Sequence, residues 1–153
     1  MQTHAATMMP TAGARGTIVR IVSTLGRVPL SLVQLLARLA IASVFLKAGL
    51  NKVASWETTV QLFADEYKVP VLPPDLAAVM ASATEIGTSL LLIVGLGTRL
   101  ATLPLLGMIA VIQTFVYPGA YAEHLTWASL LILLLTRGGG DWSLDHLFGL
   151  EPR

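Results

Sequence analysis

Two ionisable residues inside long apolar segments, Arg38 and Glu85, could do chemistry in this chain. Charged groups are costly in lipid, so they usually face the protein interior and pair there. Counting along each helix puts Arg38 roughly 13 Å and Glu85 roughly 17 Å from the same membrane face. We therefore predict an Arg38–Glu85 ion pair, with Lys47 as the other basic residue near Glu85 in depth. Such a pair either takes part in function or only fixes the packing of the helices.

Several polar residues are predicted within about two helical turns of the opposite membrane face. Together with Glu85 they could line a pocket for a lipid-like molecule with a polar ring, such as a quinone headgroup. In that pocket His124 or Glu123 could exchange protons with the ligand. The alternative is that these are interfacial residues at helix ends. The candidate pocket residues are Lys47, Gln113, Tyr117, Glu123 and His124.

The composition indicates a membrane protein. The chain has 153 residues, of which 54% are hydrophobic and only 12% are charged. Soluble domains are about 25% charged, so this chain has too few charges to cover a water-facing surface. A net charge of +1 without a basic stripe excludes a nucleic-acid partner. The lipid bilayer is therefore the expected surroundings.

Several cofactor classes are excluded by residue type. There is no cysteine, which removes disulfides, thiol catalysis and cysteine-held iron–sulfur clusters. Of the three histidines, His4, His124 and His146, only His124 can lie near the bilayer. This excludes a haem held by two histidines of one subunit, and it disfavours zinc, which needs three or four ligands together. No metal site is predicted.

Four apolar segments predict membrane-spanning helices within a membrane domain at 29–137. The first has 22 residues and would be roughly 33 Å long, enough to cross the hydrocarbon core. Pro104 falls in the first turn of the third segment, where its missing N–H costs little. The predicted fold is all-α, a transmembrane four-helix bundle. The predicted spans are 29–50, 76–96, 100–117 and 120–136.

The segment 51–75 is the one sizeable loop, and it contains a helical pattern. Trp56, Val60, Phe63 and Tyr67 recur at positions i, i+4, i+7 and i+11. This spacing predicts a short amphipathic helix. The helix could lie on the outer membrane surface with its aromatic face in the lipid, or it could cap the bundle.

The two ends of the chain are predicted to lie on one side of the membrane. Residues 1–28 are expected to form a loose tail with a turn on the membrane surface, and not a signal peptide. The tail 138–153 could lie in water or dock under the bundle, with Asp141, Ser143 and Asp145 capping and docking it. Basic residues favour the cytoplasmic side, so both termini are predicted there. The residues that set this orientation are Arg15, Arg20, Arg27, Arg99, Arg137 and Arg153, against Lys52 and Lys68 on the outer side.

Three segments resemble the DoxX family of small bacterial four-helix membrane proteins. They read ARLAIASVFLKAGLNKV (37–53), EIGTSLLLIVGLGTR (85–99) and RGGGDWSLD (137–145). The resemblance covers about residues 30–148. The family more often has a proline within the last glycine motif, where this chain has Gly139–Gly140. The matching positions are Arg38, Gly49, Lys52, Glu85, Gly95, Arg99, Gly138, Ser143 and Asp145.

The resemblance implies a location in the bacterial cytoplasmic membrane and a link to redox chemistry. Family members include subunits associated with thiosulfate:quinone oxidoreduction and with membrane oxidoreductase complexes that protect against oxidative stress, while many have no known activity. It implies a small subunit of a quinone-linked complex, with no intrinsic cofactor beyond a bound quinone. The partner would be a membrane oxidoreductase or further copies of the chain. The alternatives are a non-enzymatic assembly factor or scaffold and, third, a small-molecule or lipid transporter.

Overall fold

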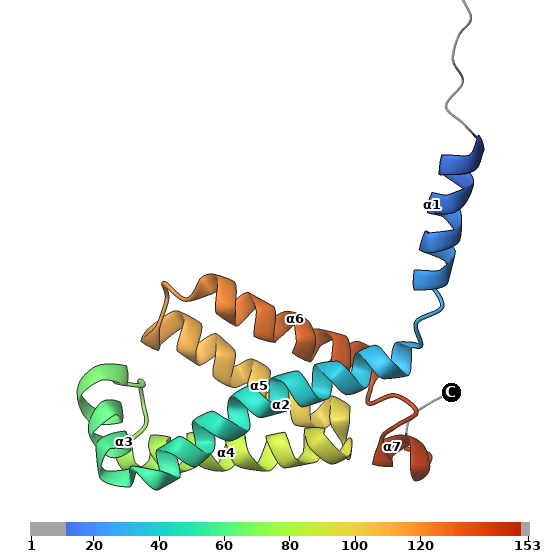
Figure 1. Cartoon of the computed structure of the whole chain (residues 1–153). Coiled ribbons are helices and arrows are strands. Elements are labelled where there is room, and N and C mark those ends of the chain that lie inside the picture. The colour runs from blue at the N-terminus through green and yellow to red at the C-terminus, as the bar shows by residue number, and fades with distance from the viewer. Residues whose placement is uncertain (1–11, 151–153) are drawn as a thin grey trace, which may run out of the picture.

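The computed structural model describes residues 12–150, and these residues are mostly helical with no strand among them (Figure 1). This confirms the all-α prediction. Two helices continue into short π-helical segments, η1 (Phe63–Tyr67) and η2 (Ile112–Val116). The α-helices are α1 (Ala12–Leu25), α2 (Leu30–Ala54), α3 (Trp56–Leu62), α4 (Pro74–Val94), α5 (Thr98–Val111), α6 (Tyr121–Arg137) and α7 (Leu144–Leu147).

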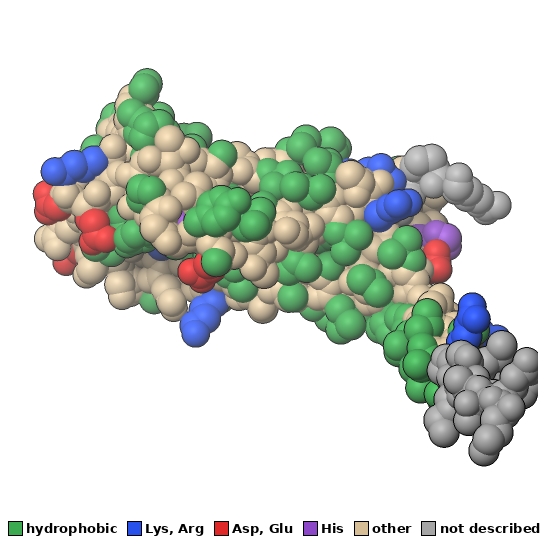
Figure 2. Space-filling view, turned by 90° about the horizontal axis from the view of Figure 1, so that it is seen from above, with side chains coloured by type: hydrophobic (Ala, Val, Ile, Leu, Met, Phe, Trp, Pro, Cys, Tyr) green, Lys and Arg blue, Asp and Glu red, His purple; other side chains and the backbone are tan. Residues whose placement is uncertain are grey.

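Three helical segments are long and apolar enough to cross a membrane: Leu30–Ala54, Pro74–Val94 and Thr98–Val116. They match the first three predicted spans, although α2 runs four residues beyond the predicted end at 50. The helix α6 is shorter, with 17 residues. Hydrophobic side chains cover much of the long body of the molecule, and most charged side chains lie toward its two ends (Figure 2).

The helices α2, α4, α5 and α6 pack side by side, with α2 between α4 and α6 and with α5 on the far side (Figure 1). Small residues bring α2 and α4 close together, as is usual for helices in membranes. A Cβ atom at Gly49 would lie only 2.7 Å from Cγ1 of Ile86. The main apolar core fills the half of this bundle nearer Arg27. Its fully buried large side chains are Ile41, Leu92, Leu105, Leu131 and Leu134.

The segment after α2 caps the bundle. Phe63 is buried and packs with Ala77 and Ala78 of α4. Tyr67 joins the same cluster, and its ring lies edge-on to that of Phe63 with 5.0 Å between the ring centroids. Of the two arrangements considered for the amphipathic helix, the structure therefore has the cap. Phe63 and Tyr67 are turned toward the protein, whereas Trp56 at the start of the segment is 38% exposed.

The prediction of a loose N-terminal tail is wrong for residues 12–25, which form α1. The first eleven residues, including His4, lie outside the described part of the chain. In α1 most of the larger apolar residues are β-branched and two glycines are present, so the helix propensity is weak and the helix was not predicted. A short turn from Gly26 to Pro29 then separates α1 from α2.

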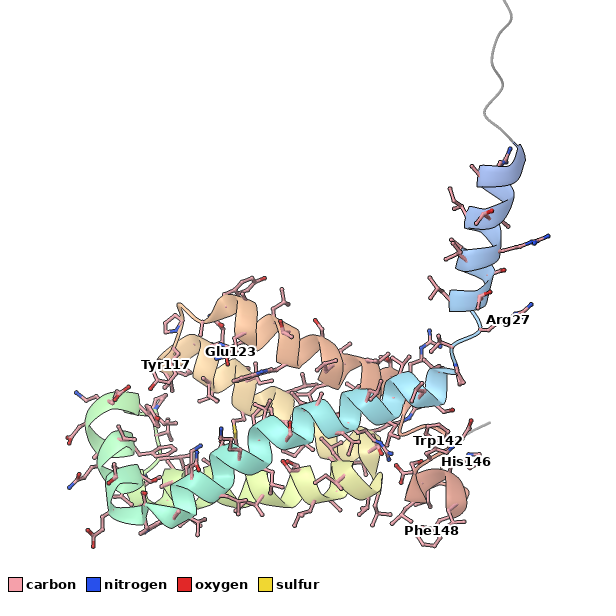
Figure 3. The ribbon with its side chains drawn as sticks, in the orientation of Figure 1. Arg27, Tyr117, Glu123, Trp142, His146 and Phe148 are labelled. Carbon is pink, nitrogen blue, oxygen red and sulfur yellow. The ribbon has the colours of Figure 1, made fainter. Side chains whose placement is uncertain are left out.

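The C-terminal tail docks against the inner end of the bundle, the end that carries Arg27 (Figure 3). Gln34 Nε2 donates to the carbonyl oxygens of Arg137 (2.7 Å) and Gly138 (3.0 Å). Arg38 Nη2 donates to the carbonyl oxygen of Trp142 at 2.7 Å. Because these donors are on α2, this helix binds the end of α6 and the segment that follows it. The structure thus has the docked arrangement of the tail.

Asp145 adds a further contact at this end by binding the N-terminus of α5. We call the contacts of Gln34, Arg38 and Asp145 the inner lock. Its Oδ1 accepts from the backbone N–H of Gly97 at 2.6 Å, and its Oδ2 accepts from that of Thr98 at 2.7 Å. The first N–H groups of a helix have no partner within the helix and attract negative charge. The Asp145 side chain is buried, so the carboxylate supplies the helix cap from a distant part of the chain.

We expect Asp145→Asn to lower the free energy of unfolding by about 2 kcal/mol, because it removes the charge from two buried hydrogen bonds. Unfolding of the purified protein in detergent micelles, followed by circular dichroism, measures this. Asp141→Asn is the matched control, since Asp141 is exposed and accepts a hydrogen bond from the half-buried Ser31. It should change stability by less than about 0.5 kcal/mol. Equal effects of the two substitutions would contradict the capping role.

Candidate functional site

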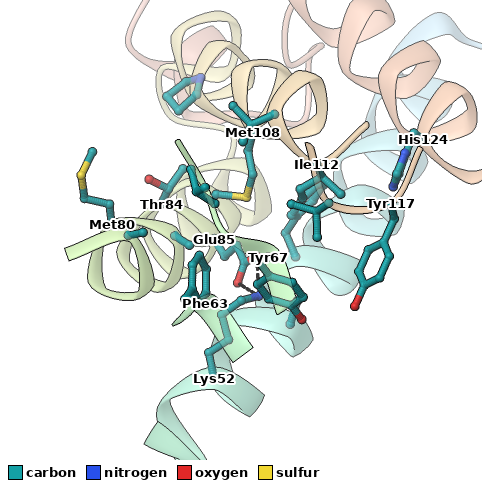
Figure 4. A pocket seen from close by; sticks show the side chains of 18 of the residues that line it. Lys52, Phe63, Tyr67, Met80, Thr84, Glu85, Met108, Ile112, Tyr117 and His124 are labelled. Atoms are coloured by element: carbon teal, nitrogen blue, oxygen red, sulfur yellow. Dashed lines mark hydrogen bonds and ion pairs between the residues drawn. The ribbon is translucent and has the colours of Figure 1, made fainter. Parts of the chain in front are cut away.

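A cavity of about 470 Å³ lies in the half of the bundle away from Arg27. It is bounded by α2, η1, α4, α5, η2 and the start of α6 (Figure 4). The lining is mainly apolar, with a few polar groups among aromatic and sulfur-containing side chains. Such a combination is typical of small-molecule sites. The larger apolar lining residues are Phe45, Phe63, Met80, Met108, Ile112 and Trp127.

A buried ion pair forms one wall of the cavity. Lys52 Nζ lies 2.7 Å from Oε1 and 2.8 Å from Oε2 of Glu85, so it donates to both carboxylate oxygens (Figure 4). The Glu85 side chain is 4% exposed and that of Lys52 is 21% exposed. Both residues line the cavity. The pair therefore places a hydrogen-bond donor and an acceptor beside a mostly apolar space.

The predicted Arg38–Glu85 pair is wrong, because the two helices are offset along their axes. Glu85 lies beside Gly49, and Arg38 lies beside Gly95. Lys52 is 14 residues after Arg38 on α2, which is roughly 21 Å along a helix. The prediction assumed that the start of α2 and the end of α4 lie at the same level. Instead, the first two turns of α2 project past the end of α4 and bind the C-terminal tail.

His124 is buried and its orientation is fixed by a chain of hydrogen bonds. Its Nδ1 lies 2.6 Å from Oε1 of Gln113, whose Nε2 donates to the carbonyl oxygen of Pro118 at 2.8 Å. An amide oxygen can only accept, so Nδ1 must carry hydrogen. In the neutral imidazole Nε2 is then an acceptor. His124, which lines the cavity, can therefore accept a hydrogen bond.

Tyr117 and Glu123 line the same cavity near its outer end (Figure 3). The Tyr117 hydroxyl donates to Oε1 of Glu66 at 2.7 Å, and its ring lies edge-on to Tyr67, with 5.8 Å between centroids. The hydrogen bond to Glu66, followed by the contact with Tyr67, raises the pKa of Tyr117 above its ordinary value. These contacts hold the η1 cap against the end of η2.

The structure brings only part of the predicted pocket together. Tyr117, Glu123 and His124 line the cavity, and Gln113 supports His124 from behind. Lys47 is exposed on the outside of the bundle and does not line it.

The position of Lys52 in the cavity wall was not predicted from the sequence. A signal was available, because Phe45, Gly49 and Lys52 are spaced at i, i+4 and i+7. This spacing continues the buried face of α2 if the helix does not end at Gly49.

The π-helical segments η1 and η2 both border the cavity, as π-helical turns frequently do at functional sites.

Pro104 is a third irregular feature. It lines the cavity from within α5, which begins at Thr98. The prediction that Pro104 lies in the first helical turn is therefore wrong. Since proline has no N–H, it frees the carbonyl of Leu100 from its helical partner.

The motif positions fall into two clusters. Arg38, Gly95 and the tail residues meet at the inner lock, where the tail contacts both α2 and the α4–α5 turn. Gly49, Lys52 and Glu85 meet at the cavity wall. The two clusters occupy opposite halves of the bundle. The sequence motifs therefore mark two ends of the bundle. The C-terminal tail is bound at one end, and the cavity lies at the other.

Packed apolar helices with a cavity between them define a multi-pass helical membrane protein. A family model described as DoxX matches residues 33–118, which is more than half of the chain. The chain belongs to the DoxX family, as its motifs predicted. No match was found among curated proteins or among solved structures.

Proposed function

We propose that this protein is a small membrane subunit of a quinone-linked oxidoreductase complex and that its cavity holds a quinone headgroup. The observation that carries the proposal is a ligand-sized apolar cavity with a buried Lys52–Glu85 pair in its wall and His124 in its lining. The cavity volume of about 470 Å³ falls within the range of about 300–1,000 Å³ that is typical of ligand pockets.

The polar groups suit both redox forms of such a ring. The two carbonyl oxygens of a quinone accept hydrogen bonds, and Lys52 Nζ is a donor at the cavity wall. The hydroxyl groups of a quinol donate, and Glu85 and neutral His124 offer acceptors. The aromatic and methionine side chains would contact the ring faces. The electron donor or acceptor would be a partner oxidoreductase, since the chain has no cysteine to hold an iron–sulfur cluster.

The proposal includes a fourth span and an orientation in the bacterial cytoplasmic membrane. The helix α6 packs along α2 and α5 for the length of the bundle, which supports its crossing the bilayer with them (Figure 1). Arg27, Arg99 and Arg137 all lie at the inner end, and Lys52 and Lys68 lie toward the other. The distribution of basic residues favours a cytoplasmic inner end, which puts the start of α2 and the end of α6 on the cytoplasmic side.

Trp127 lines the cavity and gives a direct test, because quinones quench indole fluorescence. We expect a short-chain quinone to quench the purified protein saturably, and we expect Trp127→Phe to remove that saturable component. His124→Leu keeps the side-chain volume but removes the nitrogens, so the dissociation constant should rise about fivefold, the equivalent of one neutral hydrogen bond. His146→Leu, at the exposed inner end, is the matched control and should leave binding unchanged.

Two results would reject the proposal. One is quenching that never saturates and is the same in the Trp127→Phe protein. The other is a stable stoichiometric membrane partner with no saturable quinone binding. The second result would assign the chain to the alternative class of assembly factors or scaffolds, and the cavity would then be an architectural feature. Substrate flux in proteoliposomes without a partner would assign it instead to the transporters.

A further inference from the structure

The helix α1 has an apolar face that is largely exposed. Ile18, Ile21, Val22 and Leu25 share this face at the spacing i, i+3, i+4 and i+7. Their side chains are 55–65% exposed, which means that the apolar face is open. A helix of 14 residues is roughly 21 Å long, too short to cross a bilayer. The face therefore needs an apolar neighbour other than the bundle.

The other side of α1 is polar and basic. Thr17, Arg20 and Thr24 are spaced at i, i+3 and i+7. Both threonine hydroxyls donate to backbone carbonyls one turn earlier in the same helix, so they need no outside partner. No acidic residue precedes Glu57 anywhere in the chain. The charge on this part of the protein is therefore of one sign.

The placement of α1 fits the surface of a membrane. It leaves the bundle at the Arg27 end and runs across the direction of α2 instead of along it (Figure 1, Figure 3). Because the long axis of the bundle crosses the bilayer, a helix in this direction lies along the plane of the lipid headgroups. The turn from Gly26 to Pro29 sets the change of direction.

We infer that α1 binds the surface of an anionic bilayer, with Ile18, Val22 and Leu25 in the acyl region and the arginines at the lipid phosphates. Apolar residues on one face and basic residues around them are typical of helices in the membrane interface. A second copy of α1 is a poorer partner, because pairing two such helices would bring like charges together. This inference is independent of the quinone proposal, since α1 does not line the cavity.

The absence of cysteine allows a label at one chosen position of the full-length protein. Val22→Cys places an environment-sensitive fluorophore on the apolar face, and Thr24→Cys is the matched control on the polar face. The labelled chains are reconstituted into phosphatidylcholine vesicles with or without phosphatidylglycerol. We expect a blue-shifted emission, quenched by brominated lipid, at position 22 and a water-like emission at position 24.

Each arginine near an anionic surface favours docking about fivefold. In vesicles with phosphatidylglycerol, Arg15→Gln combined with Arg20→Gln should therefore lower the ratio of docked to undocked α1 by about 25-fold. Water-like emission at both positions would overturn the inference. So would a signal at position 22 that does not respond to phosphatidylglycerol or to the arginine substitutions. A signal that requires a high ratio of protein to lipid would assign the face to a second copy, which also rejects the inference.

Discussion

Lys52→Met should lower the free energy of unfolding by about 3–5 kcal/mol, the usual cost of leaving one member of a buried ion pair alone. The carboxylate of Glu85 is almost fully buried, and Lys52 provides both of its side-chain hydrogen bonds among the described residues. Glu85→Gln should cost less, because Lys52 is partly exposed at the cavity and can reach water there. The double variant, Lys52→Met combined with Glu85→Gln, should recover stability relative to Lys52→Met, since no unpaired charge remains.

Equilibrium unfolding in mixed detergent micelles, followed by circular dichroism, measures these differences. Lys47→Met is the matched control, because it is also a lysine of α2 but is exposed and forms no ion pair with any described residue. It should cause no loss beyond about 0.5 kcal/mol. If Lys47→Met were as costly as Lys52→Met, or if the double variant were no better than Lys52→Met alone, the pair would not stabilise the cavity wall.

Gly95→Ala should destabilise the inner end by more than about 3 kcal/mol, from two separate causes. Gly95 has a φ of +70°, in the left-handed region that costs other residues about 1–2 kcal/mol. In addition, its new Cβ would overlap Nη1 of Arg38 and would lie 2.6 Å from Cβ of Ser143. Arg38 is 1% exposed, so its guanidinium would have to leave the Trp142 carbonyl while remaining buried.

Gly97→Ala separates the two causes. Gly97 also has a positive φ, +57°, but nothing lies within 4 Å of the position of its Cβ. This substitution should therefore show the backbone cost alone, about 1–2 kcal/mol. The unfolding midpoints of the two variants, measured side by side, give the cost of the overlap by difference. Equal midpoints would show that the close approach of Arg38 does not contribute to stability.

The membrane helices could be predicted from sequence because their signal is local. An apolar run of about 20 residues is sufficient to identify a spanning segment. The termini of α4 and α6 also lie within two residues of the predicted bounds, since Pro74 and Gly138 mark them. The helix α1 was not predicted, because its β-branched residues and glycines give only a weak local signal for a helix.

The partners of the buried charges could not be predicted, because they depend on the offset between helices. That offset follows from close packing at Gly49 and Gly95, which no count of residues along a single helix contains. An error of about two turns in the level of α2 was sufficient to replace Lys52 with Arg38 as the partner of Glu85. The polar residues of the cavity were easier to predict, since His124 and Tyr117 lie close in sequence to the turn between η2 and α6.

The inner lock joins residues of α2 to residues that are translated much later. The carbonyl group that accepts from Arg38 is 104 residues further along the chain, and so Arg38 is translated long before that partner exists. Gln34 is likewise translated long before the carbonyl groups at the end of α6 to which it donates. A nascent or prematurely terminated chain therefore presents unsatisfied polar groups on its first membrane helix. The hydrogen bonding of α2 is therefore completed only after α4, α5 and α6 have all been made.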